Sequence, residues 1–154
     1  MADDGLVVSQ IHIALAPALE ALKAGIGVAK EIGIRCGIAI VDRNGNTVVA
    51  IRTDGAAGRA DDAARGKATV AATLGISTAE FIENRLVHNE PLWRAMAARQ
   101  DMFLVQGGYP LKYEGQCVGG VGVSGGKHEE DSRVAEAVSK RFAEMVEKRT
   151  MPHA

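Results

Sequence analysis

The sequence lacks the features of a nucleic-acid-binding or membrane-spanning protein. Its 154 residues carry 18 basic and 19 acidic side chains, which gives a formal net charge of −1. No stripe of basic residues is visible along the chain, and this argues against a nucleic-acid partner. No apolar run approaches the roughly 20 residues that a membrane-spanning helix needs. We therefore expect neither nucleic acid nor a membrane among the partners.

Cysteine is also scarce. Cys36 and Cys117 lie far apart, each within an apolar stretch typical of a strand. Thiols in such stretches are usually buried and reduced, although a disulfide or redox pair is the alternative. No Cys-x-x-Cys motif supports that alternative. Two cysteines and four scattered histidines are also too few for a structural zinc site.

Length and composition predict one globular domain over residues 1–154. Apolar residues make up 47% of the chain and charged residues 24%, which are ordinary values for a globular protein. We find no internal repeat, linker or low-complexity segment. The acidic beginning, Met1–Asp4, lacks the basic and apolar regions of a secretory signal, so we expect a cytoplasmic protein.

The hydrophobic pattern predicts an α+β fold. Apolar side chains at spacings of three and four predict a first helix over about Leu6–Lys30. Alternation predicts a strand over Arg35–Val41, and the pair Asn44-Gly45 predicts a hairpin turn into a second strand, Thr47–Arg52. Such hairpins imply an antiparallel sheet with helices grouped around it. The other expected elements are helices at about Ala60–Leu74, Phe81–Leu86, Asn89–Arg99 and Glu129–Lys148, and strands at about Phe103–Gln106, Leu111–Tyr113 and Cys117–Val123.

Glycine, in contrast, is abundant, with 18 residues. The richest cluster ends the last predicted strand and leads through Ser124, Gly125 and Gly126 into the acidic first turn of the last helix. Glycines let a ligand approach backbone N–H groups, and a helix start favours an anion. This junction is a candidate binding floor, and the alternative is a tight turn without a ligand. A second cluster, Gly107-Gly108, is followed by Tyr109.

Three charged residues near the ends of predicted elements are candidates for ligand binding. Arg52 and Lys67 could each pair with a ligand that carries a carboxylate. Asp54 lies close to Arg52 in the sequence. The alternative is a structural ion pair, for example between Asp54 and Lys67, or simple exposure to solvent.

The start of the last predicted helix carries three possible catalytic groups. His128 and Glu129 could act as acid and base beside the glycine floor. No third residue that would orient them can be named from the sequence. Asp131 is a further catalytic candidate, and the alternative is that it caps the helix by accepting bonds from backbone N–H groups.

Taken together, several motifs resemble one known family. They are Val41–Asn46 with Arg52–Ala56, then Lys67–Ala72, and finally Gly107–Pro110 with Val118–Gly126 and Asp131. Their order and spacing resemble the GlcG/HbpS family, also called the haem-degrading family, which includes the C-terminal domain of PduO-type proteins. The resemblance covers nearly the whole chain.

The resemblance implies a five-stranded antiparallel sheet flanked by helices, similar to profilin or Roadblock domains. It also implies a homo-oligomer that binds a small molecule. Some family members bind haem, whereas others lie beside catabolic enzymes and have no agreed activity. Fold is therefore implied more firmly than function.

Haem requires an axial ligand to its iron, commonly His, Met, Cys or Tyr. In the PduO-type branch a histidine of the first helix resembles the iron ligand, and here His12 lies on the first predicted helix. The alternative is that His12 is an ordinary histidine without a ligand. The aromatic content is only 4%, with the single tryptophan Trp93, and this counts against a large porphyrin pocket. The other histidines are His88 in a polar loop, His128 beside the glycine turn and His153 in the tail.

Three functional hypotheses follow. The first is an oligomeric small-ligand-binding protein that takes haem or a related tetrapyrrole, with His12 as the iron ligand. The second is an enzyme without a cofactor, such as an isomerase, hydratase or hydrolase, acting on a small organic acid in a catabolic pathway. Its site would be a cleft between Gly107–Pro110 and Val123–His128, with Arg52 or Lys67 holding the carboxylate. The third is a structural partner subunit that docks through the alanine-rich helix Ala60–Leu74.

Overall fold

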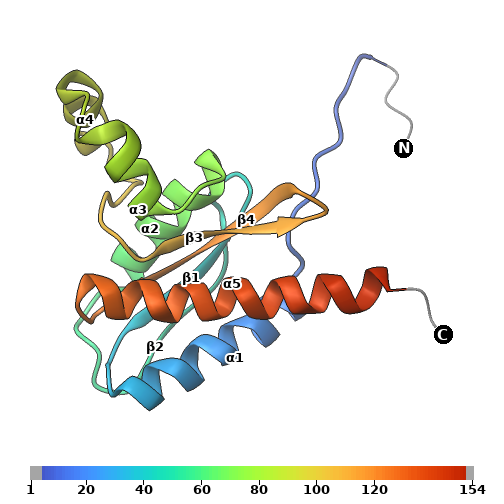
Figure 1. Cartoon of the computed structure of the whole chain (residues 1–154), viewed down its shortest axis with the longest axis horizontal. Helices are drawn as coiled ribbons and strands as arrows, with labels where there is room; N and C mark the ends of the chain where they lie inside the picture. The colour runs from blue at the N-terminus through green and yellow to red at the C-terminus, as the bar shows by residue number, and fades with distance from the viewer. Residues whose placement is uncertain (1–4, 152–154) are drawn as a thin grey trace.

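The fold is an α+β arrangement of one antiparallel sheet between helices, seen in a computed structural model that describes residues 5–151 (Figure 1). The sheet has the order β2-β1-β4-β3, and each neighbouring pair is antiparallel. In chain order the elements are α1 (Leu15–Ile32), β1 (Gly37–Asp42), β2 (Thr47–Arg52), α2 (Ala60–Leu74), α3 (Thr78–Phe81), the π-helical turn η1 (Ile82–Leu86), α4 (Glu90–Ala97), β3 (Gly108–Tyr113), β4 (Gln116–Ser124) and α5 (His128–Thr150).

The expected fifth strand is absent from residues 5–151, whose sheet has four strands. The segment Phe103–Gln106, which alternation assigned to a strand, folds back on itself because the Val105 N–H donates to the Phe103 carbonyl at 3.0 Å. Leu104 turns instead toward a small apolar cluster around Phe81. The prediction of a separate strand there was wrong because a short apolar run fits a buried loop equally well.

The predicted first hairpin is confirmed, and it shows how the turn sequence works. Gly45 adopts φ +88°, a left-handed conformation that glycine takes without strain. The Asp42 side chain closes the turn, since its Oδ1 accepts the N–H groups of Asn44 and Asn46 at 2.9 Å each. The register shifts between Ile40 and Val41, which pair with Val49 and Thr47, so Val48 of β2 is the extra residue of a bulge.

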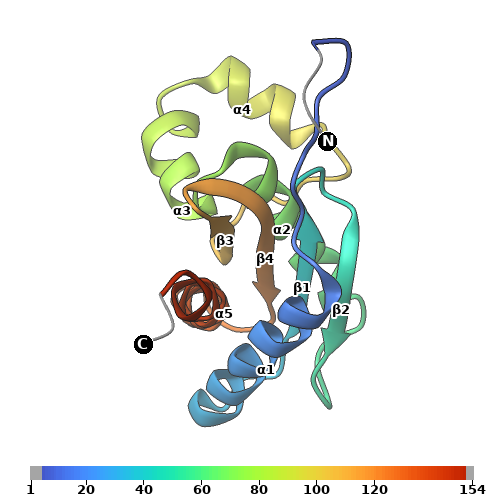
Figure 2. The ribbon, with the colours of Figure 1, turned by 90° about the vertical axis from the view of Figure 1, so that its right-hand side faces the viewer.

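One face of the sheet carries four glycines that lie against the backbone of α2, namely Gly37, Gly108, Gly120 and Gly122. Figure 2 shows α2 on this side of the sheet. A Cβ atom built on Gly122 would collide with the Ala64 carbonyl oxygen, and one on Gly120 with the Ala68 carbonyl oxygen. Small residues on both sides therefore let two backbones approach each other. This explains the alanine-rich sequence of α2 without a partner subunit.

The opposite face carries the main hydrophobic core, covered by α1 and α5. Branched side chains of β1 and β4 pack there against both helices, with Ile38, Val121 and Val138 fully buried. Gly25 of α1 lies against Val138 of α5, so the two helices cross closely. The large side chains of the chain are therefore concentrated in one of its two layers.

The first helix begins at Leu15, nine residues later than the periodicity predicted. Pro17 explains the difference, because its ring would clash with the carbonyl of Ile13 if the helix continued in the N-terminal direction. Pro17 is instead tolerated in the first turn. The preceding residues are extended and leave the body of the protein (Figure 1). The Ile13 N–H anchors them by donating to the Val118 carbonyl at 2.9 Å.

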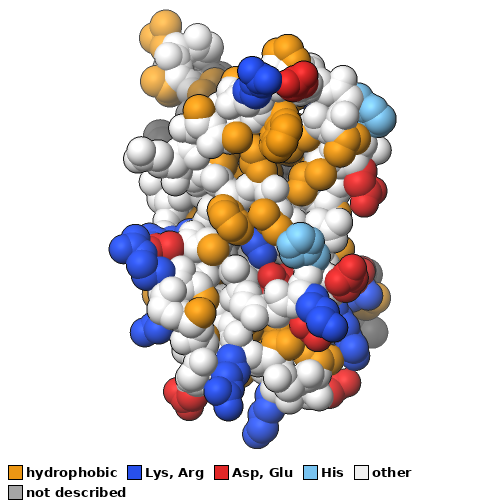
Figure 3. Space-filling model, turned by 90° about the vertical axis from the view of Figure 1, so that its left-hand side faces the viewer, with side chains coloured by type: hydrophobic (Ala, Val, Ile, Leu, Met, Phe, Trp, Pro, Cys, Tyr) orange, Lys and Arg blue, Asp and Glu red, His pale blue; other side chains and the backbone are white. Residues whose placement is uncertain are grey.

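A peripheral subdomain of α3, η1 and α4 stands beside the sheet. Ser77 caps α3, since its hydroxyl accepts the Glu80 N–H at 3.1 Å. Within the described chain, α4 contributes no buried residue. Apolar side chains gather on this end of the molecule (Figure 3), where Val87, Trp93 and Phe103 are exposed.

Candidate functional site

A groove with a volume of about 860 Å³ opens between the beginning of α1 and the C-terminal half of α5. Figure 1 shows that the N-terminal segment, the β3–β4 hairpin and this part of α5 converge at one end of the molecule. Ile13, Val118 and Phe142 form an apolar floor, and Met145 and Val146 line one wall. The floor is apolar because these side chains continue the main core outward.

His12 lies at this groove, although it is not on a helix as the sequence predicted. It belongs to the extended segment before α1, and its side chain is 33% exposed. Its Nδ1 lies 3.9 Å from Oδ2 of Asp42. The helical periodicity that placed His12 was wrong, but the side chain still reaches an apolar cavity with a carboxylate beside it.

Asp42 comes from the first hairpin and is held rigidly there. Besides the two turn bonds to Oδ1, its Oδ2 accepts from the Asn46 side-chain nitrogen at 3.1 Å. Burial opposes ionisation, yet the hydrogen bonds from Asn46 and Asn44 outweigh it and lower the pKa of Asp42. Sequence reasoning used Asp42 only as a turn residue. The pairing with His12 was missed because it joins residues thirty positions apart.

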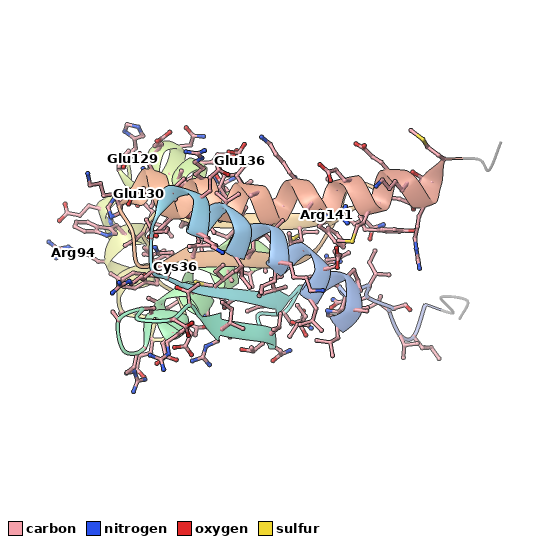
Figure 4. All side chains as sticks on the ribbon, turned by 90° about the horizontal axis from the view of Figure 1, so that it is seen from below. Cys36, Arg94, Glu129, Glu130, Glu136 and Arg141 are labelled. Atoms are coloured by element: carbon pink, nitrogen blue, oxygen red, sulfur yellow. The ribbon has the colours of Figure 1, made fainter. Side chains whose placement is uncertain are left out.

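Basic side chains border the groove on α5. Arg141 lies between α5 and α1 (Figure 4) and donates to Glu20 at 3.2 Å and to Glu144 at 3.4 Å. The hydrogen bond from Arg141, together with the charge of Lys23, lowers the pKa of Glu20. Further along, Lys148 and Arg149 line the groove from the exposed last turns of the helix. The mouth of an apolar groove is therefore positively charged on one side.

Two more side chains at the groove have atoms that can bind iron. Met145 is half-buried on α5, and Tyr113 is half-buried at the end of β3. Thioether sulfur and phenolic oxygen are both known axial donors to haem iron. Neither residue was singled out from the sequence, because methionine spacing on an amphipathic helix indicates ordinary core packing.

The glycine loops do meet, as expected, but they form no cleft. Gly108 pairs with Gly122 across β3 and β4, and the Val123 N–H donates to the Gly107 carbonyl at 2.9 Å. A Cβ atom on Gly108 would lie 2.6 Å from Cγ2 of Thr78. The Thr78 hydroxyl accepts the Gly108 N–H at 3.0 Å. The predicted cleft was wrong, because backbone and buried side chains fill this place.

Lys67 is one of those buried side chains, with only 1% of the residue exposed. Its Nζ donates to Asp131 Oδ2 at 2.9 Å and to the Val123 carbonyl at 2.7 Å. It also lies 5.9 Å from the ring centre of Phe103, within range of a cation–π interaction. The alternative of a structural ion pair therefore holds for Lys67, but its partner is Asp131 and not the suggested Asp54, which is exposed in the loop after β2. Lys67 is thus occupied by the protein and does not face a ligand.

Asp131 links this ion pair to the glycine turn. Its Oδ1 accepts the Gly126 N–H at 2.8 Å, so Asp131 binds the backbone of the turn before α5 and not the free N–H groups of the first helical turn. Glu130 adds a second bond by accepting the Lys127 N–H at 2.7 Å. The protein's own carboxylates therefore occupy the junction that was expected to bind an anion. A shallow hollow of about 660 Å³ remains outside it, lined by Gly125, Gly126 and Glu130.

The remaining candidates from the sequence are scattered. Arg52 has its Nε 3.9 Å from Asp61 Oδ1 and is half exposed. His128 and Glu129 are exposed on the first turn of α5, where Figure 4 shows Glu129 at the end of the helix away from Arg141. Tyr109 is half-buried on β3, and burial, with the charge of Glu136 adding to it, raises the pKa of its hydroxyl. The structure brings none of these described side chains to the groove of His12.

In residues 5–151 no group of three or more His, Cys, Asp or Glu side chains is placed to hold a bare metal ion. Over the same range no helix has the length and apolar character needed to cross a membrane.

The class of protein follows from comparison with known families and structures. Residues 13–140 match the model of the family described as "Haem degrading protein HbpS-like". The chain therefore belongs to the HbpS-like family, as its motifs indicated.

Three individual relatives place it more closely. An uncharacterized 15.0 kDa protein of Citrobacter freundii, from the dhaT-dhaS intergenic region, is 32% identical over 133 residues, 86% of this chain and 94% of that protein. The structure of HbpS from Streptomyces reticuli, as a double mutant, is 30% identical with a TM-score of 0.80, over 91% of this chain and 93% of HbpS. The structure of a PduOC–haem complex is 22% identical with a TM-score of 0.76, over 85% of this chain and 95% of that one, a likeness of fold.

Proposed function

We propose that this protein binds haem in the groove between α1 and α5, with His12 as an axial ligand to the iron. The observation that carries the proposal is a histidine beside a carboxylate at the edge of an apolar groove. The groove volume of about 860 Å³ lies within the about 300–1,000 Å³ typical of small-molecule sites. The family description and the haem complex of PduOC support the same ligand.

The charges around the groove suit a porphyrin that carries two propionates. Lys148 and Arg149 lie at its exposed end, where they can pair with carboxylates that remain in contact with water. Arg141 already forms an ion pair with Glu20, so it holds α5 to α1 in the wall of the groove and is not proposed to bind the ligand. The apolar floor of Ile13 and Phe142 would take the ring itself. The low aromatic content does not oppose this, since aliphatic side chains supply most of the lining.

A haem held in this groove would supply a redox-active iron. The chain's own contribution is to bind and orient the porphyrin and to keep water from one side of it. His12 donates a nitrogen, and Met145 or Tyr113 is available on the lining as a second donor.

The test is a haemin titration followed by the Soret absorbance. We expect a saturable shift at one haem per subunit in the wild-type protein. His12→Ala should weaken binding at least about tenfold, the lower limit for loss of a ligand-positioning contact. His88→Ala is the matched control, because His88 lies in an exposed turn outside the groove. Equal binding by His12→Ala and the wild-type protein would refute this site.

We further propose that the protein is a homo-oligomer. Exposed apolar side chains at two separate places support this: Val7 and Val8 on the extended N-terminal segment, and Val87 with Trp93 beside and on α4. Large exposed apolar patches mark contact surfaces in soluble proteins. Sedimentation velocity should give a mass above that of the 16.2 kDa subunit. A single species of subunit mass at micromolar concentration would contradict it.

The enzyme hypothesis has lost its proposed site. The place between the glycine loops is filled, and Lys67 is committed to Asp131. Of the two cationic candidates, Arg52 is the exposed one, and its guanidinium lies near Asp61. The cytoplasmic location expected from the sequence stays a prediction.

A further inference from the structure

We infer that Asp42 is a positioning residue for His12. It holds the imidazole proton on Nδ1 and so leaves the lone pair of Nε2 for the iron. This inference rests on the proposed function for its consequence, because only a ligand at His12 gives the free lone pair a use. It assigns a further role to the motif Asp42–Asn46, which sequence reasoning used as a turn and as part of the family resemblance.

The same strand holds the two side chains next to each other. Ile13, which follows His12, donates its N–H to the Val118 carbonyl of β4 at 2.9 Å. Asp42 pairs with Gly119, the next residue of β4, in the β1–β4 register. Adjacent positions on one central strand therefore fix the backbones of both residues. Their proximity follows from the sheet itself and not from a chance contact between flexible side chains.

The carboxylate of Asp42 has one acceptor position left for His12. Within the described chain, Oδ1 accepts two backbone N–H groups and Oδ2 accepts the Asn46 side-chain nitrogen. An ionised carboxylate offers about four lone-pair sites, so one of them remains on Oδ2. That oxygen faces His12 Nδ1 at 3.9 Å. The distance exceeds a hydrogen bond, so the inference requires the partly exposed imidazole to move closer to Asp42 when His12 binds the iron.

This arrangement suits a histidine that binds a metal. A neutral imidazole carries its proton on one nitrogen, and the hydrogen bond made by that N–H decides which nitrogen is free. Metal-binding histidines usually donate the second ring N–H to a carboxylate or carbonyl, and losing that partner costs about 10–100-fold in metal affinity. The hairpin supplies such a carboxylate, and three hydrogen bonds from Asn44 and Asn46 hold it in place.

Asp42→Asn is the variant that reverses the chemistry while conserving shape. The amide oxygen can still accept the turn N–H groups, but an NH₂ group then faces His12 Nδ1. The same NH₂ group can no longer accept from the Asn46 side-chain nitrogen, so the Asn46 amide must turn its oxygen toward it. A donor in that place favours the imidazole with its proton on Nε2. Asn44→Ala is the matched control, since Asn44 contributes only its backbone N–H to the turn and its side chain is exposed.

The first readout needs no haem. Nitrogen-15 NMR of the ligand-free protein should show His12 with its proton on Nδ1 in the wild type and in Asn44→Ala, and on Nε2 in Asp42→Asn. A wild-type His12 with its proton on Nε2 would overturn the inference, even if Asp42→Asn failed to fold.

The second readout is haemin affinity. We expect Asp42→Asn to bind about 10–100-fold more weakly than the wild type and Asn44→Ala to bind equally well. In a His12→Ala background the same substitution should have no further effect, because Asp42 acts through His12. An unchanged affinity in Asp42→Asn would overturn the inference while leaving His12 as the ligand. Absence of haemin binding in every protein would instead overturn the proposed function, and the NMR result would decide the role of Asp42 by itself.

Discussion

Replacing Lys67 with methionine should lower the stability of this protein more than most single substitutions do. Lys67 and Asp131 are 2% and 3% exposed in their side chains, so neither charge is solvated by water. Methionine is similar in length and fills the space, but it leaves the Asp131 carboxylate buried without its counter-charge. The substitution also removes the hydrogen bond that Lys67 Nζ donates to the Val123 carbonyl.

The expected magnitude follows from that geometry. Breaking a buried ion pair by removing one partner costs about 3–5 kcal/mol in the free energy of unfolding. For a chain of this size each kcal/mol lowers the melting temperature by about 2–4 °C, so the loss is about 6–20 °C. Asp131→Leu should cost a similar amount, since it leaves Lys67 charged and buried. The double variant should cost less than either single one, because it leaves no unpaired charge.

Urea unfolding of the four proteins, followed by far-ultraviolet circular dichroism, measures this cycle. Trp93 is 55% exposed on α4 and is a poor reporter of the sheet. Lys140→Met is the matched control, since Lys140 forms an exposed ion pair with Glu136 at 3.5 Å, both on α5. That pair should contribute less than about 1 kcal/mol. The reasoning fails if Lys67→Met costs no more than Lys140→Met, or if the Lys67 and Asp131 costs add.

Two further predictions concern packing and thiol chemistry. Gly122→Ala should destabilise the protein by about 1–3 kcal/mol through collision with the backbone of α2. Gly27 of α1 has open space around it, so Gly27→Ala should stabilise the protein by about 0.5–1 kcal/mol. Urea titrations that ranked the two variants in the opposite order would contradict this packing. Burial raises the pKa of Cys36 to about 11, so its thiol stays protonated at mildly alkaline pH. Iodoacetamide should therefore modify the half-buried Cys117 before Cys36, which mass spectrometry of a time course would show. Equal rates of modification at the two cysteines would contradict the burial of Cys36.

Local sequence signals predicted the elements whose structure depends on near neighbours. The strand Thr47–Arg52 has the predicted bounds, and the last helix begins within a residue of its predicted start. The first helix was placed too early because the periodicity was weighed without the restriction imposed by Pro17. A proline in a helix constrains the residues before it, so the later start was readable from the sequence.

The site could not be read in the same way, because its parts come from distant segments. Lys67 and Asp131 are 64 positions apart, and their pairing depends on how α2 and α5 approach the sheet. The contact of His12 with Asp42 depends on two adjacent positions of β4. Sequence reasoning did name His12, Lys67 and Asp131. For Lys67 it left ligand binding and a structural ion pair as alternatives, because a buried lysine and an exposed one look alike without the fold.

The glycines beneath α2 have a consequence for how this protein can adapt. Gly120 and Gly122 have no side chain that could be shortened to gain space, and even a methyl group does not fit on either of them. If the proposed groove is to accept a ligand of another size, the change is therefore expected in the opposite layer. Met145 and Val146 on α5 are the adjustable positions, because trimming or enlarging them resizes the groove while the seam between helix and sheet keeps its spacing. The packing of α2 on the sheet thus tolerates little change, whereas the groove side of α5 can vary. Substitutions on α5 are therefore the ones we expect to change which ligand the proposed groove prefers.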